Sequence, residues 1–180
     1  MIYVHLAEGF EEIEALSVVD VLRRAELPVK TVSLEKTLDV IGRSGISVKA
    51  DILFSQVNYK DGEMIVLPGG QPGTDNLMKN EELMKRVKEF HAEGKYVAAI
   101  CAAPMILGEL GIISGKEATI YPGMESYLKG GKYKDMPVVV DGNIVTSQGP
   151  ATAMAFGLEL VNLIKGEAAK REVANGVLFK

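Results

Sequence analysis

The stretch Tyr-Val-Ala-Ala-Ile-Cys-Ala-Ala-Pro-Met-Ile-Leu-Gly-Glu-Leu, residues 96–110, carries the pattern that decides the fold. A continuous apolar run over Tyr96–Ile100 is typical of a buried strand. Pro104 suits the first turn of a helix, where its missing N–H is no loss. Cys101 lies between the two, separated from the proline by two small alanines. The stretch therefore predicts a strand, a sharp turn and a helix, with a cysteine in the turn.

Strand and helix patterns alternate on both sides of this stretch. The predicted strands are 2–7, 29–34, 48–54, 64–67, 96–100, 118–121 and a hairpin of 138–140 with 144–146. The predicted helices are 11–25, 76–92, 104–110, 151–164 and 167–174. Apolar strands between amphipathic helices call for a mostly parallel sheet with helices on both faces. We expect one α/β domain over residues 1–180, because no repeat or linker interrupts the alternation.

Composition narrows the classes of protein. The 180 residues carry a formal charge of −4 with scattered acidic residues, which favours neither nucleic acid nor an anionic membrane as partner. The longest apolar stretch, 96–108, is broken by Pro104, so we expect no membrane span. A single cysteine excludes an internal disulfide and a cysteine metal cluster. Since no signal peptide is recognisable, we expect a cytoplasmic protein.

Cys101 has two interpretations. In a parallel sheet, functional groups gather at the carboxyl ends of the strands, and Cys101 follows such an end. A helix N-terminus stabilises a thiolate, although the glycine-flanked serine signature of hydrolases is absent. A free cysteine among apolar neighbours is, on the other hand, often inert. The local pattern leaves a reactive thiol and a packed core residue both open.

Glu14 is the candidate partner of this cysteine. It shares one face of the predicted helix with Val18, Val21 and Ala25, so it lies in line with the core-facing row. A carboxyl in that row either pairs with another group or keeps its proton. A protonated acid beside a thiolate can donate a hydrogen bond and transfer a proton. The alternative is an edge glutamate that bends out to water, since buried glutamates are rare.

The remaining ionisable candidates have structural explanations. Glu11 and Glu12 suit the first turn of a helix, and Glu12 points away from the core row, so we expect it in solvent. His5 lies inside the first strand, and His91 lies near a helix end that favours a cation. Neither histidine has a context that indicates a cysteine–histidine dyad.

A glycine-rich turn follows the strand 64–67. It reads Leu67-Pro68-Gly69-Gly70-Gln71-Pro72-Gly73 and lacks the lysine and spacing of a nucleotide-binding loop. Its glycines allow backbone N–H groups to come close to a ligand. The turn is either a plain connection or, beside the cysteine, an oxyanion-binding backbone.

Together these segments resemble the ThiJ/PfpI superfamily over nearly the whole chain. The matching pieces are 7–14, 20–25, 66–70, 98–104 and 146–150. Within the superfamily the chain is similar to the branch that holds the parkinsonism-associated protein deglycase and its bacterial YajL-like relatives. The resemblance implies a flavodoxin-like three-layer sandwich and a homodimer in which the helix at Glu11 contributes to the interface.

The resemblance also implies the site. Cys101 would be the nucleophile and oxidation-sensitive thiol, and Glu14 its protonated partner. The other implied site residues are the backbone groups of Gly69, Gly70 and Ala102 and the pocket residues Arg43 and Tyr121. The protease-like branch has a histidine where this chain has Ala102, which argues against a peptidase. Some relatives have a histidine where this chain has Tyr121, so no histidine base is implied.

The predicted function is a glyoxalase III or protein deglycase type of enzyme. It would act on methylglyoxal or glyoxal and on their adducts with amino groups, with no metal or organic cofactor. The alternative is an oxidative-stress redox sensor or thiol chaperone, in which Cys101 is oxidised to sulfenic or sulfinic acid. Both need the same thiolate and the same carboxylic acid, so the sequence leaves both open. An amidotransferase-like hydrolase would need a histidine partner that the sequence does not place.

Overall fold

A computed structural model describes all residues, 1–180, and contains a seven-stranded sheet in the order β10-β11-β7-β6-β1-β2-β5. The strands of this sheet are β1 (Ile2–Leu6), β2 (Val29–Ser33), β5 (Ile52–Leu53), β6 (Met64–Leu67), β7 (Tyr96–Ile100), β10 (Val138–Asp141) and β11 (Ile144–Ser147). All neighbours are parallel except β10 and β11, which form the predicted hairpin. The mostly parallel sheet is confirmed.

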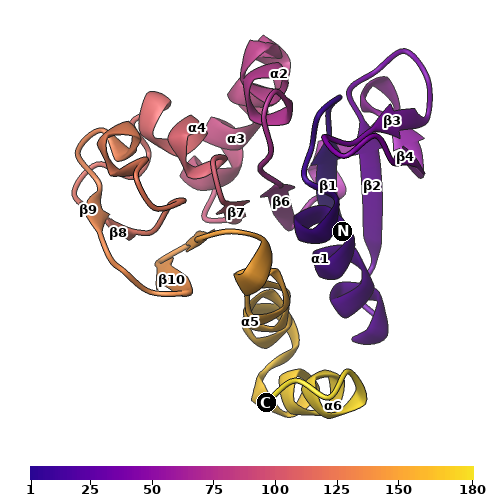
Figure 1. Cartoon of the computed structure of the whole chain (residues 1–180), viewed down its shortest axis with the longest axis vertical. Coiled ribbons are helices and arrows are strands. Elements are labelled where there is room, and N and C mark those ends of the chain that lie inside the picture. Colours follow the sequence, from indigo (N-terminus) through magenta and orange to yellow (C-terminus); the bar gives the residue numbers. More distant parts are fainter.

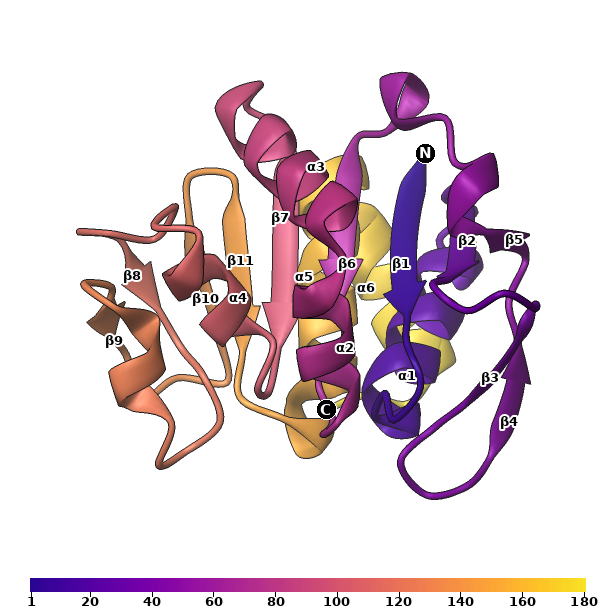
Figure 2. The same cartoon turned by 90° about the horizontal axis from the view of Figure 1, so that it is seen from above.

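Helices cover both faces of this sheet. They are α1 (Glu12–Arg24), α2 (Gly73–Lys79), α3 (Glu81–Ala92), α4 (Pro104–Glu109), α5 (Ala153–Lys165) and α6 (Glu167–Gly176). Figure 2 shows α2, α3 and α4 in front of the strands and α5 and α6 behind them. The buried side chains of α1 belong to the core that also holds those of α5 and α6. The flavodoxin-like three-layer sandwich is therefore confirmed.

Each central strand divides its side chains between two cores, because successive residues point to opposite faces of a sheet. In β6, Met64 and Val66 belong to the core that α1, α5 and α6 cover. Ile65 and Leu67 belong to the core under α2, α3 and α4. This burial on both faces explains why β6 and β7 are continuous apolar runs.

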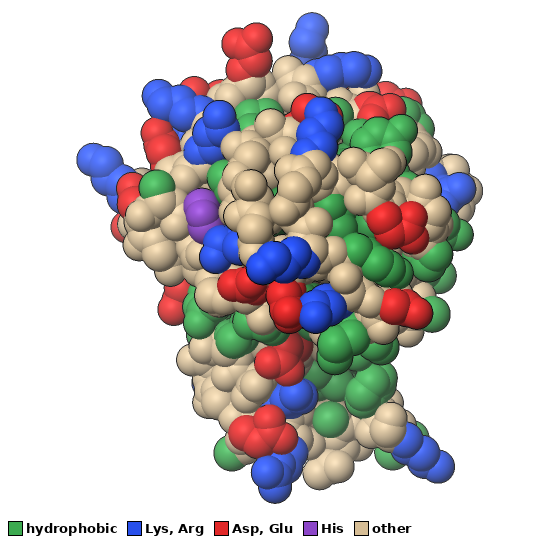
Figure 3. All heavy atoms as spheres, turned by 90° about the vertical axis from the view of Figure 1, so that its left-hand side faces the viewer, with side chains coloured by type: hydrophobic (Ala, Val, Ile, Leu, Met, Phe, Trp, Pro, Cys, Tyr) green, Lys and Arg blue, Asp and Glu red, His purple; other side chains and the backbone are tan.

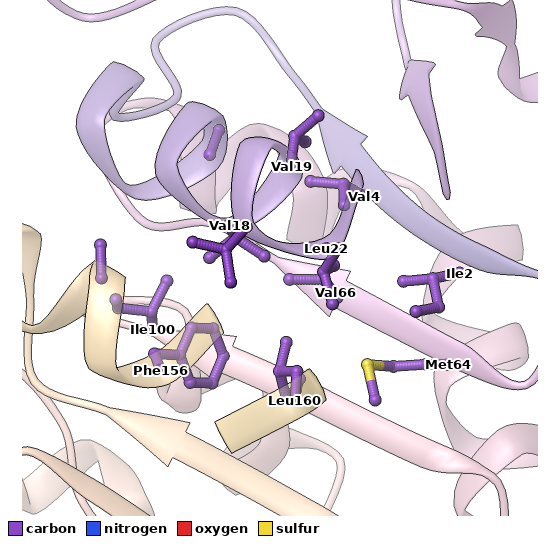
Figure 4. Close-up of a cluster of buried hydrophobic side chains, with 14 of the residues drawn as sticks. Ile2, Val4, Val18, Val19, Leu22, Met64, Val66, Ile100, Phe156 and Leu160 are labelled. Atoms are coloured by element: carbon purple, nitrogen blue, oxygen red, sulfur yellow. The ribbon is translucent and has the colours of Figure 1, made fainter. Parts of the chain in front are cut away.

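Helix α1 is held against the sheet by α5. Val18 and Leu22 of α1 lie near Phe156 and Leu160 of α5 in the core of Figure 4. Gly157 allows the two helices to approach, since a Cβ there would lie only 3.2 Å from the side chain of Val21. This packing fixes the helix that carries Glu14.

Three predicted elements differ in the structure. The helix expected over 76–92 is two helices, because Asn80 leaves the helical region and its side chain caps α3 by accepting the N–H of Leu83 at 2.9 Å. The strand expected over 48–54 is divided between β4 (Ser47–Lys49) and β5. The strand expected over 118–121 is shortened to β8 (Glu117–Ala118).

Two strand pairs lie outside the main sheet. β3 (Asp39–Ile41) forms an antiparallel hairpin with β4, and β8 pairs with β9 (Lys132–Tyr133). Figure 1 shows these pairs on opposite sides of the molecule. Short 3-10 turns occur at Phe54–Gln56, Tyr59–Asp61, Glu125–Leu128 and Pro150–Thr152.

The surface agrees with the scattered charge of the sequence. On the face in Figure 3, acidic and basic side chains are interspersed with apolar ones rather than gathered in one patch. None of the helices combines the length and the apolar character that crossing a bilayer requires.

Candidate active site

Cys101 occupies a strained turn between β7 and α4. Its φ of 64° lies in the left-handed region, which costs a non-glycine residue about 1–3 kcal/mol. Hydrogen bonds hold the residue on both sides. Its N–H donates to the carbonyl of Ser147 at 2.9 Å, and its carbonyl accepts the N–H of Tyr121 at 2.9 Å. The predicted strand–turn–helix is thus present, with the side chain 8% exposed at the carboxyl end of the sheet.

Glu14 reaches the same place from α1. The residue is fully buried, so the alternative of an edge glutamate that bends out to water is wrong. Its Oε2 accepts the N–H of Gly69 at 2.8 Å, and its Oε1 has no hydrogen-bond partner beyond the nearby thiol of Cys101. Its own N–H donates to the side chain of Glu11, which caps the helix, at 2.7 Å.

The glycine-rich turn lies between these two side chains. The carbonyl of Gly69 accepts the N–H of Glu11 at 2.9 Å, so α1 binds both the N–H and the carbonyl of this one residue. A Cβ on Gly69 would lie 2.6 Å from the Cβ of Cys101 and 2.8 Å from Oε2 of Glu14. Only glycine leaves room for this contact. Gly70 follows with φ 91°, another conformation that favours glycine.

Burial dominates the ionisation of both groups. It raises the pKa of Glu14 to about 7, against the lowering effect of hydrogen bonds with Cys101 and Gly69. While Glu14 is ionised, the pKa of Cys101 is raised to about 12, first by burial and then by the charge of Glu14 and a hydrogen bond with it. The N–H groups of Ala102 and Gly70 act on the sulfur in the opposite direction. The two side chains therefore titrate as a pair.

Glu14→Gln is expected to stabilise the protein at about pH 8 relative to wild type, and much less at about pH 4. The pKa of Glu14 rises from 4.5 in the unfolded chain to about 7 in the folded one. Between these values the folded Glu14–Cys101 pair keeps a proton that the unfolded chain has lost from Glu14, whichever of the two side chains then carries the charge. The wild type thus loses up to about 3 kcal/mol of its free energy of unfolding as the pH rises, and the loss is constant above pH 7. Glutamine has no such loss.

Urea unfolding of both proteins at the two pH values measures this difference. Glu26→Gln, at an exposed position, is the matched control. An equal effect of Glu14→Gln at both pH values would contradict the raised pKa.

The two predicted pocket residues, Arg43 and Tyr121, are exposed. Arg43 is exposed in the turn between β3 and β4, and its charge lowers the pKa of Glu14. The ring of Tyr121 is 48% exposed, and its backbone N–H is bound to Cys101. Five of the other six predicted residues thus lie next to Cys101, with Gly69, Gly70 and Ala102 contributing backbone, and Arg43 acts on Glu14 through its charge.

The expectation that Glu12 is solvent-exposed is wrong. We expected it in solvent, but it is 5% exposed, and its Oε1 accepts the N–H of Ser44 at 2.8 Å. The β3–β4 hairpin, which the sequence pattern did not reveal, covers it. Glu11 and Ser147 are the other neighbours that the sequence did not indicate. The position of Glu11 at the start of a helix is a signal for capping. Ser147 contacts Cys101 through its backbone carbonyl, and no side-chain pattern predicts such a contact.

The histidines lie away from this site. His5 is fully buried, its Nε2 lies 2.7 Å from the Tyr59 hydroxyl, and burial lowers its pKa to about 3. His91 lies in the last turn of α3, with Nδ1 3.0 Å from Oδ1 of Asn143. Both positions agree with structural roles.

The family profile described as DJ-1/PfpI family matches residues 1–163. This chain belongs to the DJ-1/PfpI family. Among solved structures of the family, "Toxoplasma gondii DJ-1, oxidized" is 35% identical, with a TM-score of 0.95 over 99% of this chain and 97% of that one. The fold of this chain is thus that of the DJ-1 structures.

Two curated members of the DJ-1/PfpI family illustrate its range. "Deglycase PfpI" of Pyrococcus furiosus is 35% identical over 88% of this chain and 96% of its own length. "Protein DJ-1 homolog B" of Arabidopsis thaliana is 34% identical over 98% of this chain, which spans only 41% of that protein. The family therefore includes proteins named deglycases and proteins more than twice as long as this chain.

Proposed function

We propose that this protein is a cysteine-dependent enzyme that converts methylglyoxal or glyoxal, free or as adducts on amino groups, to hydroxy acids without a cofactor. The observation that carries the proposal is the contact between Cys101, on a strained turn at a helix start, and the buried carboxyl of Glu14. Family members named deglycases support it. Backbone strain at Cys101 and a buried carboxyl at Glu14 both cost stability, and their meeting at one thiol is typical of a functional site.

The negative charge of the pair belongs on the sulfur. Two of the causes that raise the pKa of Cys101 act only while Glu14 is ionised. When Glu14 holds the proton, burial alone opposes the thiolate, and the N–H groups of Gly70 and Ala102 stabilise it. Oε2 of Glu14 is already an acceptor for Gly69, so the proton lies on Oε1, which has no other donor. Glu14 then donates to the thiolate.

The first chemical step is addition. The thiolate attacks the aldehyde carbon of methylglyoxal, a C–S bond forms, and the carbonyl electron pair moves to oxygen. In this proposal the N–H groups of Gly70 and Ala102, which act on the sulfur before the attack, stabilise the oxyanion. Glu14 transfers its proton to the oxygen, which leaves a hemithioacetal on Cys101 and a carboxylate at Glu14.

Isomerisation and hydrolysis follow. The Glu14 carboxylate removes the C–H proton of the hemithioacetal carbon, and the electron pair forms an enediolate with the neighbouring ketone. Glu14 returns this proton to the second carbon, and the hydroxyl proton of the first carbon passes to the oxygen of the second. The first carbon is then a thioester on Cys101, and the second carries a hydroxyl. Water then cleaves the thioester and releases lactate, or glycolate from glyoxal. The sum consumes one water, and one carbon is reduced as its neighbour is oxidised.

Arg43 and Tyr121 complete the pocket in this proposal. Tyr121 takes the place at which some relatives have a histidine, and its hydroxyl orients a substrate oxygen rather than removing a proton. The exposed guanidinium of Arg43 favours the anionic form of the pair, because it already acts on Glu14 through its charge.

The test is conversion of methylglyoxal to lactate by the purified protein with no added metal or thiol. Lactate formation that follows protein concentration supports the proposal. Unchanged methylglyoxal would refute it.

A redox role for the same thiol is the second candidate. The observation in its favour is that a DJ-1 structure with the same fold is described as oxidised. Here peroxide converts Cys101 to a sulfinate that accepts a hydrogen bond from Glu14. Mass spectrometry after mild peroxide treatment tests this role. Equal oxidation of wild type and Glu14→Ala would argue against it.

A second copy of this chain is the proposed partner. Apolar side chains are exposed on the start of α1 and on the neighbouring hairpin: Ile13 and Ile46 are each 56% exposed, and Leu16 and Ile41 are also exposed. A homodimer through this face would bury them. Sedimentation equilibrium of wild type and Ile13→Glu tests it. A monomeric wild type would contradict the proposal.

A further inference from the structure

Glu12 is buried at a cost that its own hydrogen bonds do not explain. Its Oε1 has one donor, the N–H of Ser44, and its Oε2 is buried with no partner. A carboxylate with a free oxygen in a buried position has lost solvation that an exposed glutamate keeps. The first turn of a helix favours negative charge, but an exposed acid there would gain the same benefit. The contact with the hairpin turn is what distinguishes this position.

The turn that Glu12 holds is the one that carries Arg43. The N–H of Arg43 donates to the carbonyl of Phe10 at 2.8 Å, and the next N–H, of Ser44, donates to Glu12. Gly42 crosses the Glu12 carboxylate so closely that a Cβ there would overlap it. Backbone bonds and close contact thus fix the turn on both sides of Arg43.

Arg43 acts on the Cys101–Glu14 pair through its positive charge. The charged or titratable groups that act on Glu14 are Glu11 from its own helix, Cys101 from the end of β7 and Arg43 from the hairpin. Arg43 is the one cation among them. Its side chain is exposed, so its effect depends on where the turn is held.

We propose that Glu12 is a positioning residue, which holds the β3–β4 turn so that Arg43 stands beside the Cys101–Glu14 pair and favours the negative charge of that pair. The inference rests on the proposed function of this pair. Two carboxyls that lie two residues apart on α1 thus have different roles: Glu14 exchanges the proton, and Glu12 places the cation that tunes the exchange.

The sign of the pH effect separates positioning from direct electrostatics. If the charge of Glu12 acted directly on the pair, its loss would lower the pH midpoint at which Cys101 becomes reactive. Glu12 is not among the groups that act on Glu14, so loss of its charge alone should leave the midpoint unchanged. Displacing Arg43 would raise that midpoint. Glu12→Gln keeps an oxygen acceptor for Ser44 and removes the charge. Glu12→Ala removes both.

The experiment is the rate of alkylation of Cys101 by iodoacetamide as a function of pH. The chain has one cysteine, so the reagent reports Cys101 alone. Variants are Glu12→Gln, Glu12→Ala, Arg43→Met and the double variant Glu12→Ala with Arg43→Met. Asp20→Asn is the matched control, because Asp20 is an exposed acid on the same helix.

We expect the pH midpoint of alkylation to lie about 0.5 pH higher in Glu12→Ala and in Arg43→Met than in wild type. The double variant should show no further rise. Glu12→Gln and Asp20→Asn should match wild type. A midpoint unchanged in Glu12→Ala, or lowered in both Glu12 variants, would overturn the inference. If Glu12→Ala does not fold, Gly42→Ala disturbs the same contact from the hairpin side and should raise the midpoint likewise.

Alkylation needs no turnover, so the two proposals fail separately. The expected shifts in a protein that leaves methylglyoxal unchanged would refute the reaction and support the positioning role. Normal conversion of methylglyoxal without the shifts would do the reverse.

Discussion

Cys101→Ser is expected to lower kcat/KM for methylglyoxal by about 10³-fold or more, because the nucleophile of the reaction is lost. Serine fits the space of the cysteine, so the bonds to Ser147 and Tyr121 remain. A serine hydroxyl at this position lies beside Glu14. A carboxyl with a pKa of about 7 is too weak a base to remove the proton of an alcohol. Binding therefore survives and covalent addition does not. Lactate formation over a range of methylglyoxal concentrations measures the effect.

Thermal unfolding of the serine variant serves as the control, since an unchanged Tm shows that the turn is intact. Equal activity in wild type and Cys101→Ser would remove the covalent mechanism. It would also leave the strain at Cys101 without a catalytic explanation.

Gly69→Ala is expected to abolish activity and to destabilise the protein. The added methyl group would lie within 3 Å of three groups, the Cβ of Cys101, Oε2 of Glu14 and the carbonyl of Ile100. None of these is the end of a flexible surface chain, so the backbone must shift, at about 1–3 kcal/mol. The shift separates thiol from carboxyl and breaks the bond from the Gly69 N–H. Urea unfolding and the lactate assay together measure both effects.

Gly176→Ala is the matched control, because a Cβ there meets no atom within 4 Å. It should keep full activity and wild-type stability. A Gly69→Ala protein with normal activity would mean that the close contact between turn, thiol and carboxyl is unimportant for the reaction.

The main sheet was predictable because its strands are buried on both faces. β6 and β7 are apolar at every position, and this pattern can be recognised without knowing which strands pair with them. Short edge elements were not predictable for the opposite reason. β3 and β9 have three and two residues, and their pairing partners lie elsewhere in the chain. The break between α2 and α3 had a local signal, since Asn80 before two acids is a typical helix cap.

The site was predictable where one helix decides it and not where two segments meet. Glu14 is buried because it lies in line with the apolar row of α1, which spacing alone reveals. Glu12 is buried because a hairpin from residues 39–49 folds over it, and helical spacing contains no information about that hairpin. The sequence did not reveal how strongly burial opposes the thiolate, or that an ionised Glu14 opposes it further while the N–H groups of Ala102 and Gly70 favour it.

The most direct test of the account is the ionisation of Cys101, followed by thiolate absorbance against pH in wild type and in Glu14→Ala, with Cys101→Ser subtracted to remove the tyrosines. The proposed mechanism predicts that the thiolate of wild type forms with a pH midpoint below the free-thiol value of about 8.5. The midpoint in Glu14→Ala should be higher, because the variant loses the proton donor. A wild-type midpoint above that value that falls in Glu14→Ala would contradict the account. It would place the charge on the carboxylate and the proton on the sulfur.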